Sequence, residues 1–497
     1  MSQPTRAEWE ARAKALKIEG RAFIQGEYLG AASGETFDCI SPVDGRLLAK
    51  VASCDAADAE RAVQSARATF DSGVWSREAP ATRKAVMIRF ATLLEEHAEE
   101  LALLETLDMG KPIGDSLNVD LPGAADSLRW SGEAIDKVYD EVAATSHDQL
   151  GLVTREPVGV VAAIVPWNFP LMMAAWKLGP ALATGNSVIL KPSERSPLTA
   201  IRIAQLAIEA GIPAGVLNVL PGYGHTVGKA LALHMDVDTA VFTGSTRIAK
   251  QLMVYAGESN MKRVWLEAGG KSPNIVFEDA PDLQAAADAA AAAIAFNQGE
   301  VCTAGSRLLV QKSIKAKFLP LVVEALKGWK AGHPLDPETN VGALVDGRQL
   351  EQVLGYIQAG QDEGAKILTG GKRVLEETGG TYVEPTLFDG VSNAMKIARE
   401  EIFGPVLSVI EFEDAEEAIR IANDTPYGLA AAVWTRDISK AHLTARALRA
   451  GSVWVNMYDG GDMTAPFGGF KQSGNGRDKS LHAFDKYTEL KATWIKL

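Results

Sequence analysis

Cysteine is scarce in this sequence: Cys39, Cys54 and Cys302 are the only three among 497 residues. Three cysteines do not make a disulfide framework, and the sequence contains no CxxC or HExxH motif. We therefore expect neither a disulfide-stabilised fold nor a structural or catalytic zinc site. The same cysteine usage predicts no bound metal and a reducing, cytoplasmic location.

Basic runs and long apolar runs are also missing. The formal net charge is -13, the pI is about 5.2, and no five basic residues follow one another, which argues against nucleic-acid binding. Residues 158–176 are the most apolar stretch. Pro166, Asn168 and Pro170 interrupt it, so we expect a buried strand and a loop, not a membrane span. Residues 1–20 are charged and polar, so no signal peptide is expected.

The length of 497 residues exceeds one hydrophobic core, so two or three domains are expected. From residue 158, short apolar runs alternate with helical patterns, which predicts an α/β fold with two doubly wound parallel sheets. Expected strands cover residues 158–165, 187–190, 216–220, 239–242, 274–277, 308–310, 406–412, 430–435 and 452–456. Expected helices cover residues 55–70, 81–109, 122–139, 173–183, 198–210, 226–234, 247–256, 283–297, 314–327, 348–361, 415–423 and 439–448.

Cys302 lies in a glycine-punctuated turn, residues 296–307, between an alanine-rich helix and a strand. A thiol on such a loop is accessible to a substrate, but most free cysteines are buried hydrophobes, and the turn alone leaves both interpretations open. Two other stretches favour catalysis: Glu267 precedes a Gly-Gly turn, and Asn168 interrupts an apolar run. A nucleophile, an acid/base and an amide donor are the parts needed for covalent chemistry on a carbonyl.

The sequence lacks the usual dinucleotide fingerprint, GxGxxG; the nearest match, residues 222–228, has its third glycine one position late. A better phosphate site is Gly244-Ser245-Thr246, which follows an expected strand and opens a helix. An ordinary helix cap has the same pattern. Lys191 and Glu194 follow the strand 187–190, where such side chains can bind ribose hydroxyls, although a solvated loop pair is the common alternative.

Seven blocks together resemble the NAD(P)-dependent aldehyde dehydrogenase superfamily, and they occur in that family's order across most of the chain. The blocks are residues 166–168, 191–194, 242–245, 267–271, 299–302, 401–405 and 466–469. Ala268 replaces the leucine that the family commonly has. Asp478, in Gly476-Arg477-Asp478, replaces a frequent glutamate.

The resemblance implies that Cys302 attacks the aldehyde, that Asn168 stabilises the oxyanion, and that Glu267 activates water to hydrolyse the thioester. What activates the thiol stays open between its environment, Glu267 and the cofactor. The implied cofactor is NAD, which Glu194 favours by repelling a 2′-phosphate, with NADP as a second acceptor. The implied cofactor-binding residues are Ile164, Pro166, Trp167, Lys191, Ser193, Glu194, Gly224, Gly228, Gly244, Ser245, Glu401 and Phe403.

Four aromatic residues, Phe169, Trp176, Phe296 and Phe467, match positions of the family's substrate tunnel. Residues 458–469 and 474–483 resemble the branch acting on polyamine-derived aldehydes, which includes γ-glutamyl-γ-aminobutyraldehyde and 4-guanidinobutyraldehyde dehydrogenases. The resemblance implies that Asp120 and Asp459 border the tunnel mouth. We expect an ω-amino or ω-guanidino aldehyde of about four carbons, held by these carboxylates and aromatics. The alternatives are a broad enzyme for neutral aldehydes, a coenzyme A-acylating enzyme and a non-enzymatic nucleotide-binding scaffold.

The expected domain organisation follows the same resemblance. Residues 1–140 and 158–270 are expected to form the cofactor-binding domain, residues 271–470 the catalytic domain, and residues 141–157 and 484–497 an oligomerisation element. Residues 141–156 are polar and alternating, which indicates a protruding hairpin. The tail alternates like an edge strand, and the resemblance implies that it pairs with this hairpin and with another subunit. We therefore expect a homodimer or homotetramer.

Overall fold

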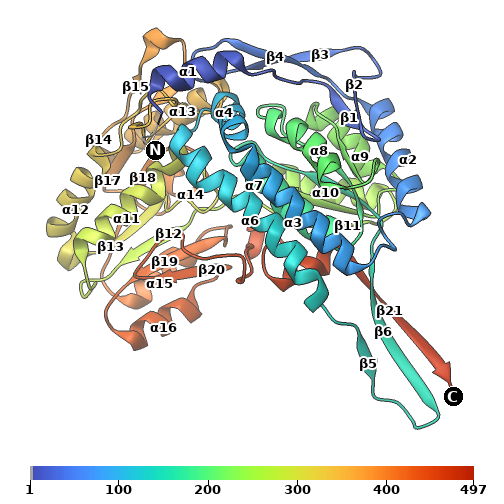
Figure 1. The fold of residues 1–497 in the computed structure, drawn as a ribbon. Helices are drawn as coiled ribbons and strands as arrows, with labels where there is room; N and C mark the ends of the chain where they lie inside the picture. Colours follow the sequence, from blue (N-terminus) through green and yellow to red (C-terminus); the bar gives the residue numbers. More distant parts are fainter. Residues whose placement is uncertain (1–3) are drawn as a thin grey trace.

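The computed structural model describes residues 4–497, which contain two seven-stranded sheets and three smaller ones (Figure 1). The first large sheet has the order β11-β10-β7-β8-β9-β1-β2. Its parallel strands are β7 (Val160–Ile164), β8 (Ser187–Lys191), β9 (Leu217–Val219), β10 (Thr239–Thr243) and β11 (Arg263–Glu267). The hairpin of β1 (Ala22–Ile24) and β2 (Glu27–Leu29) adds an antiparallel edge.

The second large sheet has the order β14-β17-β18-β13-β12-β19-β20, and all its strands except β14 are parallel. The strands are β12 (Pro273–Val276), β13 (Arg307–Gln311), β14 (Lys366–Thr369), β17 (Thr386–Asp389), β18 (Val406–Phe412), β19 (Ala430–Trp434) and β20 (Ser452–Val455). Two doubly wound α/β sheets were the predicted architecture, and the fold confirms it.

Helices cover both faces of the first sheet, and the strand residues alternate accordingly. In β7, Val161 and Ala163 pack in one core with residues of α7 (Pro170–Ala183) and α8 (Leu198–Ala210). Val160 and Ala162 point the other way, into a second core with α2 (Ala56–Ser72) and α9 (Lys229–Leu233). Burial on both faces explains why these strands read as continuous apolar runs.

The remaining long helices also lie where the apolar periodicity predicts them. Around the first sheet they are α3 (Pro80–Glu96), α4 (Ala98–Met109), α6 (Leu121–Ala134) and α10 (Thr246–Glu258). Around the second they are α11 (Leu283–Ala295), α12 (Lys312–Lys327), α13 (Gly347–Asp362), α15 (Ala415–Asn423) and α16 (Ile438–Ala447). The alanine-rich α11 begins at Asp282, whose carboxylate accepts hydrogen bonds from the first-turn N–H groups of Gln284 and Ala285.

Three predicted boundaries were wrong. The helix expected over residues 81–109 is broken at His97, whose φ of -105° and ψ of 24° are not helical, so α3 ends there and α4 begins. The helix expected over residues 122–139 is α-helical to Ala134 and continues only as a 3-10 turn, Ile135–Lys137. The helix expected over residues 226–234 is a π-helical turn, Gly224–Gly228, followed by the short α9. Apolar periodicity survives such breaks, so it does not reveal them.

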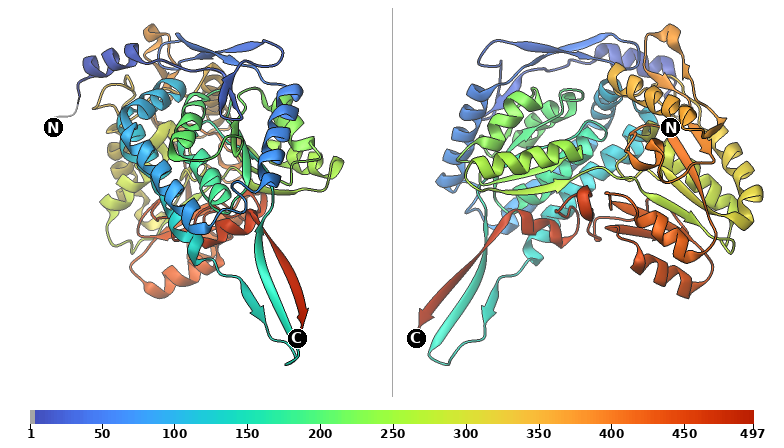
Figure 2. Two further views of the ribbon diagram at one scale, coloured as in Figure 1. Left: turned by 45° about the vertical axis from the view of Figure 1, so that its right-hand side comes forward. Right: turned by 180° about the vertical axis from the view of Figure 1, so that it is seen from behind.

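A narrow three-stranded sheet extends away from the body (Figures 1 and 2). It consists of β5 (Glu141–Ala143), β6 (Gln149–Pro157) and β21 (Thr488–Lys496). The tail therefore pairs with the hairpin, as the resemblance implied. Leu490, Trp494 and Ile495 of β21 are exposed large apolar side chains.

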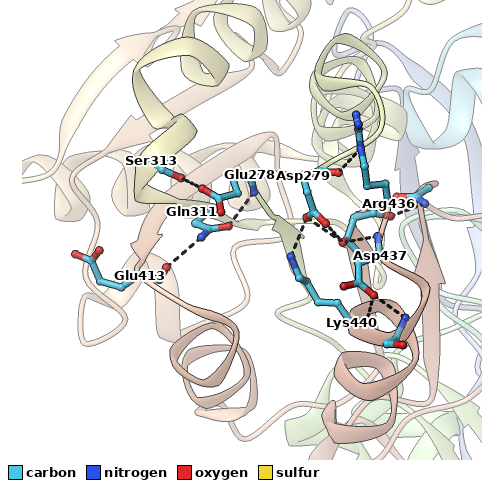
Figure 3. A network of polar contacts seen from close by, with 11 residues as sticks. Glu278, Asp279, Gln311, Ser313, Glu413, Arg436, Asp437 and Lys440 are labelled. Carbon is cyan, nitrogen blue, oxygen red and sulfur yellow. Dashed lines mark hydrogen bonds and ion pairs between the residues drawn. The ribbon is translucent and has the colours of Figure 1, made fainter.

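A polar network occupies the carboxyl ends of the second sheet's strands (Figure 3). Asp279 follows β12; its carboxylate accepts hydrogen bonds from Thr435 Oγ1 and from Lys440 Nζ, which is 3.0 Å away. Gln311, at the end of β13, accepts from the Glu278 N–H at 2.8 Å. In doubly wound sheets ligands bind beyond the carboxyl ends. Here these groups are paired with one another.

Candidate active site

A cavity of about 690 Å³ lies where the two large sheets face each other. The first sheet contributes the loops that follow its carboxyl ends, residues 166–169, 193–195 and 243–245, together with Glu267 at the end of β11. The second sheet contributes loops that precede its amino ends, including residues 301–303 before β13 and residues 401 and 403 before β18. The pocket thus lies between the carboxyl ends of the first sheet's strands and the amino ends of the second sheet's strands.

The loop carrying Cys302 is held in an unusual conformation. Asn297 and Gln298 both have positive φ, 46° and 55°, which non-glycine residues adopt rarely. Gly270 lies against this loop, and a Cβ there would stand 2.6 Å from the Cys302 carbonyl oxygen. Close packing therefore fixes the position of the thiol, and the thiol lies on the cavity wall, half-buried.

Burial raises the pKa of the Cys302 thiol above its ordinary value, and the negative charges of Asp459, Glu401 and Glu267 raise it further. The thiolate is the nucleophilic form of cysteine. The thiol is therefore protonated at neutral pH in this state, and it needs a base or a positive charge before it can attack a substrate.

The predicted oxyanion donor, Asn168, comes from the loop after β7 and lies in the same cavity. Its side-chain amide donates to the backbone oxygen of Glu300, 2.7 Å away. In return, the side-chain amide of Asn297 donates to the backbone oxygen of Asn168 at 3.0 Å. These two hydrogen bonds tie the Asn168 loop to the loop that carries Cys302.

The predicted base, Glu267, ends β11 on the cavity wall and is 3% exposed. Within residues 4–497, neither carboxylate oxygen has a hydrogen-bond partner. Burial raises the pKa of Glu267, and the negative charge of Asp478 adds to this rise, while Lys177 and Lys486 oppose it. A buried, unpartnered carboxylate of this kind has a greater affinity for a proton than an exposed one.

A buried ion cluster behind Glu267 escaped the sequence analysis. Asp478 is completely buried, and one carboxylate oxygen binds Lys177 Nζ while the other binds Lys486 Nζ. Both lysines are buried as well. The three charges come from α7, from the loop after residue 470 and from the turn before β21, so nothing in their sequence spacing could predict their meeting.

Most of the predicted nucleotide residues gather at the cavity's other end. Ser245 caps α10, and its hydroxyl accepts from the Ile248 N–H at 3.4 Å. Glu401 accepts from the Gly270 N–H at 3.0 Å, and burial raises the pKa of Glu401 to about 7. Phe403, with a φ of 57°, packs edge-on against Trp167, with ring centroids 5.1 Å apart.

Most of the predicted nucleotide residues line the cavity, but not all do. Those on the lining are Pro166, Trp167, Ser193, Glu194, Gly244, Ser245, Glu401 and Phe403. Lys191 is buried behind the lining, with its Nζ 3.3 Å from a Glu194 carboxylate oxygen. Ile164 is also buried, and Gly224 and Gly228, in the π-helical turn, are not part of the lining.

Aromatic rings form the wall of the substrate end. Phe169 stacks on Phe296 with centroids 6.2 Å apart, and Trp176 meets Phe467 edge-on at 5.2 Å. All four rings line the cavity. Asp459, with a φ of 54°, lines the same cavity. The surrounding protein raises the pKa of the Asp459 carboxylate, and the positive charge of Lys479 partly opposes this rise.

Asp120 does not lie where the resemblance placed it. It is completely buried, is not part of the cavity lining, and binds Lys111 Nζ. Lys111 also lies 3.3 Å from Glu105 and 4.1 Å from the Phe169 ring centroid. Because Asp120 is buried beside this lysine and does not line the cavity, the expectation that Asp120 meets a substrate cation at the tunnel mouth is wrong.

The structure adds a charged residue that the sequence analysis left without a role. Lys479 lines the cavity, with its Nζ 4.6 Å from the centroid of the Trp176 ring and 5.9 Å from that of Phe467. Lys479 lies in residues 474–483, which resemble the polyamine-aldehyde branch, but the spacing of residues in this segment does not predict that the Lys479 side chain lines the cavity.

Comparison with known proteins shows which family this chain belongs to. The model of the aldehyde dehydrogenase family matches residues 28–493. The chain belongs to the aldehyde dehydrogenase family. The family and the fold that the seven blocks predicted are thereby confirmed.

Relatives of this aldehyde dehydrogenase cover its whole length. The NADP/NAD-dependent aldehyde dehydrogenase PuuC of Escherichia coli (strain K12) is 58% identical over 99% of this chain and 98% of its own. A mutant of the P. syringae indole-3-acetaldehyde dehydrogenase AldA, in complex with NAD+ and IAA, is 84% identical, with a TM-score of 0.99 over 100% of both chains. The γ-glutamyl-γ-aminobutyraldehyde dehydrogenase of Burkholderia cenocepacia J2315 is 64% identical, with a TM-score of 0.98 over 99% and 100%.

The residues of this aldehyde dehydrogenase fit a dinucleotide. A helix N-terminus with Gly244 and Ser245 suits a pyrophosphate, and the carboxylates of Glu194 and Glu401 suit ribose hydroxyls. In residues 4–497 there is no group of histidine, cysteine and acidic side chains able to hold a metal ion. Over the same residues, the structure contains no helix with the length and apolar character of a membrane span.

Proposed function

We propose that this aldehyde dehydrogenase oxidises its substrate to the free carboxylic acid through a covalent bond to Cys302. In this proposal Glu267 is the base for hydrolysis, and Asn168 stabilises the oxyanion. The observation that carries the proposal is that these three side chains, which come from two separate loops and the end of β11, line one cavity.

In the first step the Cys302 sulfur bonds to the aldehyde carbon, and the thiol proton passes to a base. The aldehyde oxygen becomes negative and accepts hydrogen bonds from the Cys302 backbone N–H and the Asn168 amide. Each such donor is worth roughly 3 kcal/mol in the transition state. Nicotinamide, when bound, supplies the hydride acceptor for the oxidation.

The second half of the reaction releases the acid. Glu267 takes a proton from water, the water oxygen bonds to the thioester carbon, and the Cys302 thiolate leaves. The raised pKa of Glu267 supports this role, because it makes the carboxylate a stronger base than an exposed glutamate. The same buried base supports water over coenzyme A as acceptor. A steady-state requirement for coenzyme A would contradict this assignment.

We propose NAD as the preferred cofactor and NADP as a second one. Glu194 lies on the cavity lining, where its carboxylate would accept from ribose hydroxyls and repel a 2′-phosphate. Lys191 Nζ lies 3.3 Å from that carboxylate, and its positive charge weakens the repulsion of a 2′-phosphate. The name of the E. coli relative, which includes both cofactors, supports use of either.

We propose an ω-amino or ω-guanidino aldehyde, or an acylated relative of one, as the substrate. Asp459 supplies a carboxylate for the far end, and the rings of Phe169, Trp176, Phe296 and Phe467 supply an apolar wall for the methylenes. The name of the B. cenocepacia relative supports this class. The name of the P. syringae relative, an indole aldehyde dehydrogenase, supports the alternative, broad use of neutral aldehydes on the same aromatic wall.

Steady-state kinetics with a matched pair of aldehydes tests the substrate class. Wild-type enzyme should have a lower KM for 4-aminobutyraldehyde than for butyraldehyde. Asp459→Asn should raise the first KM about tenfold and change the second by less than about twofold. Asp126→Asn, at an exposed position outside the cavity, is the control for loss of one negative charge. Equal effects of Asp459→Asn on both aldehydes would favour the broad neutral-aldehyde alternative.

We further propose the domain organisation and the assembly that the resemblance implied. The two separate hydrogen-bonded sheets support a cofactor domain of residues 1–140 and 158–270 and a catalytic domain of residues 271–470. The sheet of residues 141–157 and 484–497, with its exposed apolar side chains, supports a homodimer or homotetramer. Free Cys39, Cys54 and Cys302 support a reducing, cytoplasmic location.

A further inference from the structure

Lys479 is a cation inside the substrate end of the cavity. Its Nζ stands 4.6 Å from the centroid of Trp176 and 5.9 Å from that of Phe467, two rings that form the aromatic wall. A lysine that served only solubility would extend into bulk water. This one lies against the surface that a bound aldehyde would touch.

The backbone holds Lys479 in this direction. Asp478, which precedes Lys479, exchanges two backbone hydrogen bonds with Phe467, of 2.8 and 2.7 Å. Ser480, which follows Lys479, donates its N–H to the Met463 oxygen at 2.8 Å. Between these anchors, Lys479 and Ser480 have positive φ, 58° and 51°. Such conformations cost energy for non-glycine residues and persist where the surroundings impose them, often at ligand-binding positions.

Lys479 has no carboxylate partner of its own. In residues 4–497, no acidic oxygen lies within 4.0 Å of its Nζ, although Asp459, Asp462 and Asp478 are near enough to influence it. Asp478 is occupied by Lys177 and Lys486. Asp459 is exposed in the same cavity without pairing to Lys479. Two opposite charges thus line the pocket separately, and each is available to a ligand.

We infer that Lys479 is a specificity residue that binds a carboxylate at the far end of an aldehyde substrate. A ligand carboxylate would replace the weak contact with the aromatic faces by charge-assisted hydrogen bonds. Lys479 opposes a bare cationic end, whereas Asp459 attracts it, so an end that carries both charges would satisfy both residues. The inference rests on the proposed aldehyde oxidation and extends its substrate class to anionic aldehydes.

Kinetics with three aldehydes of equal chain length test the inference: succinic semialdehyde, butyraldehyde and 4-aminobutyraldehyde. Lys479→Met keeps the apolar stem on the rings and removes the charge. It should raise KM for succinic semialdehyde about tenfold, change KM for butyraldehyde less than about twofold, and leave or lower KM for 4-aminobutyraldehyde. Lys479→Arg should keep KM for the anionic aldehyde within about threefold of wild type.

Lys366→Gln is the matched control, because Lys366 is exposed on β14, outside the cavity. Binding of NAD by each variant verifies that it is folded. A fall in kcat that is the same for all three aldehydes would overturn the inference, since it would mean that Lys479 acts on Cys302 and not on the substrate's far end. An unchanged KM for succinic semialdehyde would also overturn it. If the wild-type enzyme oxidised none of the three, the proposed function itself would fail.

Discussion

The side-chain amide of Asn168 donates a hydrogen bond to the backbone oxygen of Glu300, 2.7 Å away, and so couples the loop after β7 to the loop that carries Cys302. One N–H of the amide is used in this bond, and the other remains for an oxyanion.

Replacing Asn168 should therefore lower catalysis strongly. Asn168→Ala removes the oxyanion donor, so kcat should fall by about 10²- to 10³-fold. Stopped-flow measurement of NADH formation would locate the loss in the first turnover. Asn168→Asp, which keeps the shape but not the donor, should lose about as much. Wild-type kcat in either variant would remove Asn168 from the mechanism.

Glu267→Gln should slow release of the acid more than formation of the thioester. We expect a burst of NADH, up to one per Cys302, followed by slow turnover, because glutamine cannot take a proton from water. Cys302→Ala is the control: it should show no burst while binding NAD within about threefold of wild type. A wild-type steady-state rate for Glu267→Gln would exclude Glu267 as the base.

The same residue predicts the pH profile. As the proposed base, Glu267 can accept a proton only when it is ionised, and burial raises its pKa. The acidic limb of the kcat profile should therefore lie above the ordinary range of a glutamate, with activity falling as pH drops through the raised pKa. A limb that stays in the range of exposed carboxylates, measured where hydrolysis limits turnover, would contradict the assignment.

Glu194→Gln should change cofactor preference. The variant loses the like-charge repulsion of a 2′-phosphate, so kcat/KM for NADP should rise relative to that for NAD by about tenfold. Measuring both cofactors at fixed aldehyde tests this. The matched control is Glu363→Gln, an exposed glutamate outside the cavity. A wild-type preference for NADP over NAD would refute the role given to Glu194.

Asp478→Asn should destabilise the protein, because it leaves Lys177 and Lys486 charged, buried and without a carboxylate. Breaking a buried ion cluster in this way costs about 3–5 kcal/mol. Those lysines hold the pKa of Asp478 below its ordinary value, so its stabilisation is present above the unfolded-state pKa and is lost as pH falls through the lower folded-state pKa.

Thermal unfolding at several pH values tests this prediction. The variant should unfold at a lower temperature at neutral pH, and its deficit should shrink at strongly acidic pH. Asp126→Asn breaks an exposed ion pair with Arg129 and should cost less than about 1 kcal/mol. Equal melting temperatures for Asp478→Asn and the wild type would contradict the prediction.

Removal of β21 should dissociate the enzyme. Truncation after Tyr487 exposes the edge of β6 and removes Leu490, Trp494 and Ile495. Sedimentation at micromolar concentration should change from a dimer or tetramer to a monomer. The milder variant Trp494→Ser keeps the strand and should shift the same equilibrium partway. A wild-type chain that sediments as a monomer would rule out the proposed assembly.

The sequence by itself determined most elements of this protein and singled out the residues that we propose as its reacting groups. The predicted bounds of the apolar strands β8 and β18 and of the amphipathic helix α15 were nearly correct. Burial of one or two faces of an element imposes a hydrophobic period that is visible in the local sequence. Local patterns also singled out Cys302, Glu267 and Asn168, because each is a polar group in an apolar or glycine-rich setting.

Only the tertiary structure decided how these groups meet and which charges face the cavity. Asp120 and Asp459 look alike in the sequence, yet one is neutralised by Lys111 inside the protein and the other faces the pocket. Asp478 meets Lys177 across 301 positions. Lys479, its neighbour, turns inward because a left-handed backbone aims it there. Ion pairing and side-chain direction depend on distances in space, which no local pattern in the chain records.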